Sequence, residues 1–238
     1  MTKLSVNINK IATLRNSRGG DTPNLVQVAI DIQDFGAQGI TIHPRPDERH
    51  IKYKDTYDLK PVVKTEFNIE GNPIPKFIDL VLANKPEQVT LVPDSVDTLT
   101  SNAGWNTVDN FSFLEEVVSE FKRNNIRTSI FMDNNFDFIE SAAKLGADRI
   151  ELYTEEFATQ YKKGNENAIN PYIESAKFAK KLGLGINAGH DLSLDNIKFF
   201  SNNIPNLLEV SIGHALIAES LYLGLQNVIN MYLYKLKK

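Results

Sequence analysis

Short runs of apolar and β-branched residues recur along the chain, separated by longer mixed segments. Most of the runs are apolar at consecutive positions, which is typical of parallel strands covered by helices on both faces. We expect eight strands, over Leu4–Asn9, Gly39–His43, Thr65–Glu70, Gln88–Pro93, Arg127–Met132, Arg149–Thr154, Gly183–Ala188 and Leu207–Ile212.

Between these runs, apolar residues repeat at helical spacing. The clearest stripes are Leu25/Val28/Ala29/Ile32/Phe35, Phe77/Ile78/Val81/Leu82, Leu114/Val117/Val118/Phe121 and Tyr172/Ile173/Ala176/Ala179. Gly36 and Gly146 stand just before the next expected strand and Gly183 at its start, where glycine usually ends the preceding helix. Eight alternations of strand and helix in 238 residues predict one (β/α)8 TIM barrel domain over 1–238. The alternative is an open doubly wound sheet. No G-x-G-x-x-G turn follows the first strand, which argues against a dinucleotide-binding version of that fold.

The composition excludes several classes of protein. A net charge of −4 argues against a general nucleic-acid binder, although small phosphorylated ligands need only a few well-placed cations and backbone N–H groups. The absence of cysteine excludes disulfides, thiolate metal sites and a cysteine nucleophile. We expect no membrane association and a cytoplasmic location, since no apolar stretch approaches a membrane span and Met1–Asn9 lacks the apolar core of a signal peptide.

Polar groups capable of proton transfer lie at the ends of the predicted strands. His43, His190 and His214 end a strand or follow it within two residues, and Glu70 and Glu151 belong to two other strands. The carboxyl ends of all strands form the catalytic rim of a (β/α)8 barrel. We therefore expect one site at that rim, with Asn7 and Asn9 added by the first strand.

Taken one at a time, each of these residues could be a structural hydrogen-bonding group. Glu151 could pair with Arg149, and the charged run around His50 could be a solvated loop. Histidines from different strands could converge on a metal, but no local metal-ligand spacing is present. A Ser-His-Asp triad lacks its G-x-S-x-G elbow. A Schiff base would need a lysine at a strand end, for which Lys10 is the candidate.

A phosphate site is better supported. Val210-Ser211-Ile212-Gly213-His214 reads as the last strand, a glycine turn and a helix start, where free N–H groups would face the rim. Arg18 and Arg45 offer bidentate partners for a second anion.

With these residues in view, the chain resembles the pyridoxine 5′-phosphate synthase family almost from end to end. The matching segments are Val6–Asn16 with Arg18-Gly19, Gly39–Ile51, Phe67-Asn68-Ile69-Glu70, Leu91-Val92-Pro93, Ile186–His190 and Ile212–Ala215. Together they contain all four histidines.

The resemblance implies condensation of 3-amino-2-oxopropyl phosphate with 1-deoxy-D-xylulose 5-phosphate to pyridoxine 5′-phosphate, phosphate and water. It also implies no metal or organic cofactor and a homo-oligomer, often an octamer. His43 and Glu70 would be general bases, His190 a general acid and Glu151 a transition-state stabiliser. The substrate-binding residues would be Asn7, Arg18, Gly213 and His214 for the aminoketone phosphate and Arg45, His50 and Thr100 for deoxyxylulose phosphate.

Three positions depart from the family pattern and affect expected substrate binding. Asn9-Lys10 replaces a common Asp-His pair that the family assigns to deoxyxylulose phosphate. Asp191 follows His190, where a glycine is common beside the aminoketone phosphate, and the match around Thr100 is loose. Other phosphate-binding barrels, such as a sugar-phosphate epimerase or aldolase, and a non-catalytic phosphometabolite-binding barrel are the alternatives. Segments Asp94–Trp105 and Tyr153–Asn167 are candidates for a closing loop because they are long and polar.

Overall fold

The computed structural model describes residues 1–94 and 103–237, which form a closed barrel of eight parallel strands. Each strand pairs with the next, and β1 also pairs with β8. The strands are β1 (Lys3–Asn7), β2 (Gly39–Ile42), β3 (Glu66–Gly71), β4 (Gln88–Leu91), β5 (Arg127–Met132), β6 (Arg149–Tyr153), β7 (Gly185–Gly189) and β8 (Leu207–Ile212). Closure confirms the predicted (β/α)8 barrel and rules out the open sheet.

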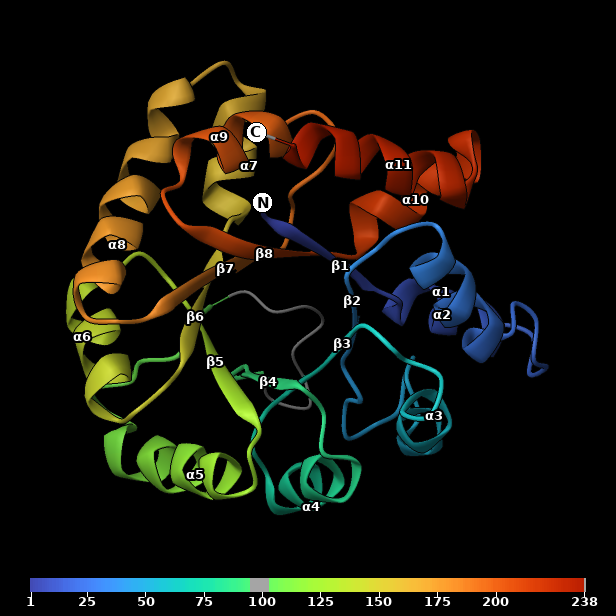
Figure 1. Ribbon diagram of the computed structural model, residues 1–238, viewed down its shortest axis with the longest axis horizontal. Helices are drawn as coiled ribbons and strands as arrows, with labels where there is room; N and C mark the ends of the chain where they lie inside the picture. Colours follow the sequence, from blue (N-terminus) through green and yellow to red (C-terminus); the bar gives the residue numbers. More distant parts are fainter. Residues whose placement is uncertain (95–102, 238) are drawn as a thin grey trace.

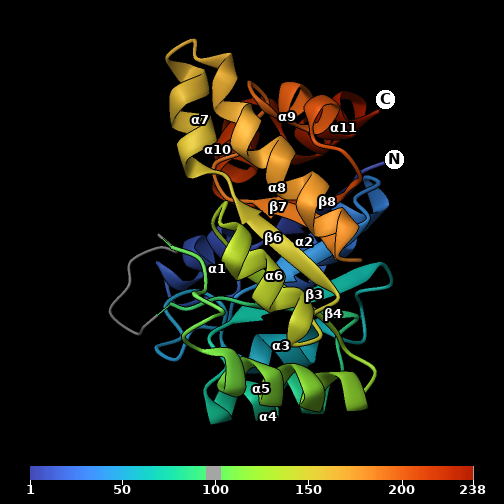
Figure 2. The same cartoon turned by 90° about the vertical axis from the view of Figure 1, so that its left-hand side faces the viewer.

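An outer layer of helices surrounds the strands (Figure 1). The same arrangement is seen from the side (Figure 2). The helices are α1 (Asn9–Asn16), α2 (Leu25–Asp34), α3 (Tyr53–Leu59), α4 (Pro75–Asn84), α5 (Phe111–Arg123), α6 (Phe136–Lys144), α7 (Glu155–Lys162), the 3-10 helix η1 (Glu166–Ile169), α8 (Asn170–Lys181), α9 (Ile197–Asn203), α10 (His214–Leu223) and α11 (Leu225–Leu236). Helices α10 and α11 pack together beside α1 and α2 (Figure 1). Among the described helices, none is long and apolar enough to cross a membrane.

The predicted apolar stripes face the core. Leu25, Ala29 and Ile32 of α2 are buried, as are Leu114, Val117, Val118 and Phe121 of α5. Gly36, Gly146 and Gly183 adopt φ values of 103°, 91° and 83°, so glycine ends α2, α6 and α8 in the left-handed conformation that it adopts without strain.

Two predicted segments differ from the structure. Asn9 was expected to end the first strand, but β1 ends at Asn7 and Asn9 begins α1. The side chain of Asn7 accepts a hydrogen bond from the Asn9 backbone N–H at 3.0 Å, and this local turn directs the chain into the helix. Segment Tyr153–Asn167 was expected to be a loop, but most of it forms α7, where Phe157 is fully buried. Most of the other candidate loop lies outside the described residues.

Polar side chains connect neighbouring strands inside the barrel, where branched apolar residues are usual. Ser5 and Thr41 share a hydrogen bond of 2.7 Å, and Asn68 donates to Thr41 at 3.3 Å. Thr90 donates to the Asn68 side-chain oxygen Oδ1 at 3.1 Å, and its hydroxyl also lies 3.5 Å from Glu151 Oε2. The barrel interior is therefore a hydrogen-bonded polar core that leads to Glu151.

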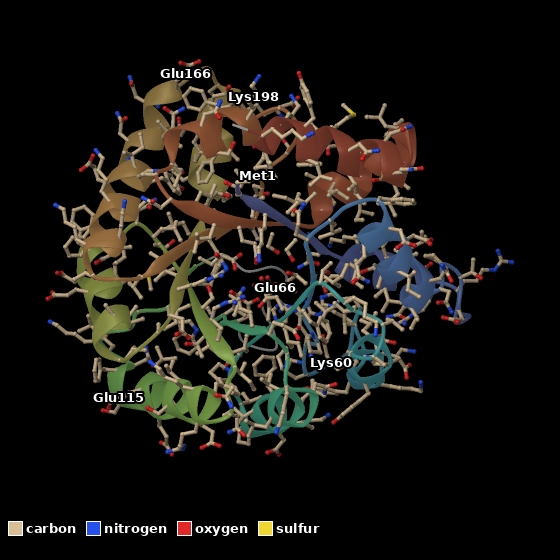
Figure 3. All side chains as sticks on the ribbon, in the orientation of Figure 1. Met1, Lys60, Glu66, Glu115, Glu166 and Lys198 are labelled. Atoms are coloured by element: carbon tan, nitrogen blue, oxygen red, sulfur yellow. The ribbon has the colours of Figure 1, made fainter. Side chains whose placement is uncertain are left out.

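A layer of charged side chains fills the opposite end of the barrel. Arg127 contacts Glu66, and Arg149 Nη1 lies 3.8 Å from both Glu66 Oε1 and Glu209 Oε2. Glu66 is labelled near the centre of the ring of strands, whereas Glu115 is labelled at its periphery (Figure 3). Burial raises the pKa of Glu209, and the nearby Arg149 charge opposes that rise. This layer closes the end of the barrel away from the predicted rim.

Replacing Arg149 should therefore destabilise the protein strongly. Arg149→Met removes a positive charge that lies beside the buried carboxylates of Glu66 and Glu209. Loss of one partner of a buried ion pair typically lowers the free energy of unfolding by about 3–5 kcal/mol. Urea denaturation of the variant and the wild type measures the difference. Lys177→Met is the matched control, because Lys177 pairs with Glu174 at the surface and its loss should change stability by less than about 0.5 kcal/mol. Equal stability of the two variants would show that Arg149 contributes no stability through this buried layer.

Candidate active site

A cavity of about 660 Å³ opens at the carboxyl ends of the strands. Its lining includes most of the predicted site residues, namely Asn7, Asn9, Lys10, His43, Arg45, His50, Glu70, Glu151, His190, Asp191, Gly213 and His214. Arg18 is exposed in the turn after α1 and does not line the cavity. Thr100 lies outside the described residues. Barrel closure thus brings together side chains that are more than 200 residues apart in the sequence.

Two asparagines link the end of β1 and the start of α1 to the ends of β3 and β2. Asn9 Oδ1 accepts a hydrogen bond from the His43 backbone N–H at 2.9 Å, while Asn7 Nδ2 donates to Glu70 Oε2 at 3.4 Å. Asn9 therefore fixes the backbone that carries His43, although it belongs to a helix. Lys10, the next residue of α1, is exposed at the mouth of the cavity.

The loop that carries His50 is held by a buried ion pair. Arg15 donates to both carboxylate oxygens of Asp55 at 2.7 and 2.8 Å, and Asn16 Nδ2 donates to the His50 carbonyl at 2.7 Å. His50 Nδ1 accepts the Ile51 backbone N–H at 2.9 Å, so the proton of the neutral ring is on Nε2. Burial, followed by the charge of Arg45, lowers the pKa of His50 to about 4. His50 therefore offers a neutral N–H donor to the cavity.

His43 lies next to His50, with ring centroids 6.2 Å apart. Burial lowers the pKa of His43 well below its ordinary value, and the charge of Arg45 acts in the same direction. The imidazole is therefore neutral near pH 7 and can accept a proton. Arg45 is itself buried and forms an ion pair with Asp94.

Two carboxyl groups line the same cavity from β3 and β6. Burial raises the pKa of Glu70 well above its ordinary value, and the charge of Glu151 adds to that effect. Burial also raises the pKa of Glu151 to about 7, although a hydrogen bond from Thr90 opposes the rise. A carboxyl group whose pKa is raised to about 7, as that of Glu151 is, can exchange a proton near neutral pH.

Gly189 makes room for Glu151. A Cβ atom at Gly189 would lie 2.3 Å from Glu151 Oε1 and 3.2 Å from the Ser211 carbonyl oxygen. Any larger residue would push the carboxyl group out of its position. A glycine at the end of β7 is therefore required by the side chain on β6.

The chain reaches the cavity again after β7 and β8. His190 and Asp191 directly follow β7, and the His190 Nδ1 atom contacts Asp191 Oδ2. After β8, Gly213 caps α10, and a Cβ atom there would lie 3.2 Å from the Asn7 side chain. The first N–H groups of a helix have no partner within the helix, so the start of α10 at this rim is suited to bind an anion.

Sequence reasoning missed several residues that support the site. Asp94, the partner of Arg45, directly follows the Leu91-Val92-Pro93 segment, and Ser211, which hydrogen-bonds Glu70, lies just before the Gly213 turn. Their positions at strand ends could have identified them. The Arg15–Asp55 pair gave no such signal, because its partners are separated along the chain. Within the described ranges, no group of three His, Cys, Asp or Glu side chains is arranged to hold a metal ion.

Comparison with known proteins gives a family match over residues 4–238, to "Pyridoxal phosphate biosynthesis protein PdxJ". The chain is 69% identical to the pyridoxine 5′-phosphate synthase of Flavobacterium johnsoniae and 65% identical to that of Christiangramia forsetii. Each alignment spans 237 residues and covers 100% of both chains.

Solved structures of low sequence identity share the fold. A phosphoribosylanthranilate isomerase from Thermotoga maritima has a TM-score of 0.63 at 14% identity, and the alignment covers 99% of this chain and 98% of the other. A thiamine phosphate pyrophosphorylase from Pyrococcus furiosus also has a TM-score of 0.63, at 11% identity, with 99% and 95% coverage. These similarities concern the barrel alone.

The raised pKa of Glu151 predicts a dependence of stability on pH. The unfolded chain releases this proton near pH 4.3, about the ordinary glutamate value, whereas the folded protein keeps it up to about pH 7. The contribution of Glu151 to stability is therefore present at low pH and is lost as the pH rises through 7. Glu151→Gln stays neutral, so its unfolding free energy should rise relative to the wild type by about 3 kcal/mol from about pH 5 to pH 9.

Chemical denaturation of both proteins across that pH range measures the effect. Glu174→Gln serves as the control, because Glu174 is exposed on α8 and the curve of this variant should run parallel to the wild type. If the curve for Glu151→Gln also ran parallel to that of the wild type, the pKa of Glu151 in the folded protein would be the ordinary glutamate value.

Proposed function

Because the chain belongs to the family of the pyridoxal phosphate biosynthesis protein PdxJ, we propose that it is a pyridoxine 5′-phosphate synthase. It would condense 3-amino-2-oxopropyl phosphate with 1-deoxy-D-xylulose 5-phosphate and release pyridoxine 5′-phosphate, inorganic phosphate and water. The observation that carries the proposal is a single cavity that combines proton-transfer groups with cationic side chains and a helix N-terminus.

The residues around the cavity suit this chemistry. Amine–ketone condensation, loss of phosphate and water, and ring closure all require proton transfers, and the substrate's own amine can form the imine. His43 would act as a base because it is neutral near pH 7. Glu70 would be the second base, His190 the acid, and Glu151 would stabilise a transition state. No lysine nucleophile is needed.

Two edges of the cavity would hold the two phosphates. The Gly213-His214 turn and Asn7 would bind the aminoketone phosphate, where the start of α10 meets β1. Arg45, His50 and Lys10 would bind deoxyxylulose phosphate next to Asn9. Roles for Arg18 and Thr100 in substrate binding stay predictions.

We expect a homo-oligomer, with an octamer as the proposed order, and a cytoplasmic location. Exposed apolar side chains on the last two helices support assembly. Leu221, Tyr222 and Tyr234 are 75%, 91% and 72% exposed. Such a group is a suitable contact surface for another subunit.

The direct test of the proposed reaction uses purified protein treated exhaustively with EDTA. Incubation with both substrates should yield pyridoxine 5′-phosphate and equimolar inorganic phosphate at the untreated rate. Activity that returns only with a divalent ion would show that His43 and His190 are not free acids and bases. Conversion of a single sugar phosphate would favour an epimerase or aldolase, and binding without turnover would favour a non-catalytic barrel.

Glu70→Gln should reduce kcat by about 10²–10⁴-fold and change KM little. The amide keeps the shape of the side chain and removes its basicity. Steady-state kinetics with each substrate varied in turn measure both constants, and Glu174→Gln should match the wild type. Near-normal turnover of Glu70→Gln would leave Glu70 a structural role only.

Lys10→Ala should raise KM for deoxyxylulose phosphate and leave kcat largely unchanged. Lys10 is an exposed positive charge at the mouth, and its attraction for an anion is equal in the ground and transition states. Lys122→Ala, an exposed lysine on α5, is the control. A collapse of kcat, together with borohydride trapping of substrate on wild type but not on Lys10→Ala, would identify a Schiff-base nucleophile instead.

A further inference from the structure

The two residues that follow β7 have an unusual backbone conformation. His190 and Asp191 have φ values of 72° and 53°, in the left-handed region that residues other than glycine seldom adopt. The surrounding structure holds this conformation. Thr154 Oγ1 donates to the Gly189 carbonyl at 2.8 Å and also bonds the His190 carbonyl, and Asn196 Nδ2 donates to the Asp191 carbonyl at 3.2 Å. Strain of this kind persists only where neighbouring contacts enforce it.

This conformation brings the two side chains together at the cavity. The His190 Nδ1 atom contacts Asp191 Oδ2, and both residues line the cavity. Tyr153 lies against the His190 ring in a T-shaped arrangement, with centroids 5.1 Å apart. The imidazole is therefore held by a carboxylate on Nδ1 and by an aromatic ring on another side.

We propose that Asp191 is a positioning residue that holds His190 by its Nδ1–H group, so that Nε2 is the atom that exchanges a proton with substrate. A carboxylate that accepts Nδ1–H fixes the tautomer of a histidine and stabilises its protonated form. The imidazolium passes its Nε2 proton to the departing oxygen, and the neutral ring keeps the Nδ1 proton on the bond with Asp191. The proposal rests on the proposed function of His190 as general acid.

This role differs from the substrate-binding role expected from the sequence. A carboxylate beside a phosphate repels it, so an Asp191 at a phosphate subsite would weaken binding of the aminoketone phosphate. The contact of Asp191 with the His190 imidazole instead gives the carboxylate charge a favourable partner. The two roles make opposite predictions for KM and kcat.

Two variants of Asp191 separate these roles. Asp191→Asn keeps the shape and removes the charge, and Asp191→Gly removes the side chain while tolerating the left-handed backbone. In both variants kcat should fall about 10- to 100-fold. A general acid typically contributes a rate enhancement of about 10²–10⁴-fold, and loss of the positioning residue should remove part of it. KM for the aminoketone phosphate should stay within about twofold of the wild-type value, since Asp191 contacts His190 and not the substrate. Asp195→Asn, an exposed neighbour, should leave both constants unchanged.

A second readout needs no turnover. ¹⁵N NMR of histidine-labelled protein, with His190→Ala used to assign the signal, should show neutral His190 as the Nδ1–H tautomer in the wild type. Asp191→Gly should shift it toward the Nε2–H form. An unchanged tautomer, or a lower KM at unchanged kcat, would overturn the positioning role. If the wild type produces no pyridoxine 5′-phosphate yet the tautomer shifts, the proposed function fails and the His190–Asp191 contact stands.

Discussion

The pairing of β1 with β8 is the interaction on which the site depends. It closes eight parallel strands into a ring, so that every strand ends at the same rim. Closure places the Gly213 turn against Asn7, where a Cβ atom at Gly213 would be only 3.2 Å from the Asn7 side chain. Without the pairing of β1 with β8, the start of α10 and the residues after β2 would not line the same cavity.

Closure also determines the electrostatics of the cavity. Side chains that point inward are removed from water, and this raises the pKa values of Glu70 and Glu151 and lowers those of His43 and His50. The polar core below the cavity compensates for part of this burial, because Thr90 donates a hydrogen bond toward Glu151. Neutral imidazoles, and a Glu151 carboxyl group that can gain or lose its proton near pH 7, thus follow from burial, which the barrel imposes.

The fold could be predicted from the sequence because consecutive apolar runs and helix-ending glycines are local signals. The rim residues could be predicted because His43 and His190 lie directly after strands. Contacts between segments that are distant in the sequence could not be predicted. The Arg15–Asp55 pair that fixes the His50 loop, and the ion layer around Arg149, depend on which side chains the barrel brings together. The start of α1 at Asn9 was not predicted because the apolar pattern does not end β1. The strand ends where the backbone N–H of Asn9 donates a hydrogen bond to the Asn7 side chain.

We infer that Glu70 and Glu151 act as one unit within the cavity, because the charge of Glu151 raises the pKa of Glu70. A double-mutant cycle in kcat tests it most directly, with Glu70→Gln, Glu151→Gln and the double variant assayed under the same conditions. Groups that act together show effects that are not additive. The double variant should therefore be impaired about as much as the worse single variant. A loss in kcat equal to the product of the two single losses would contradict the claim.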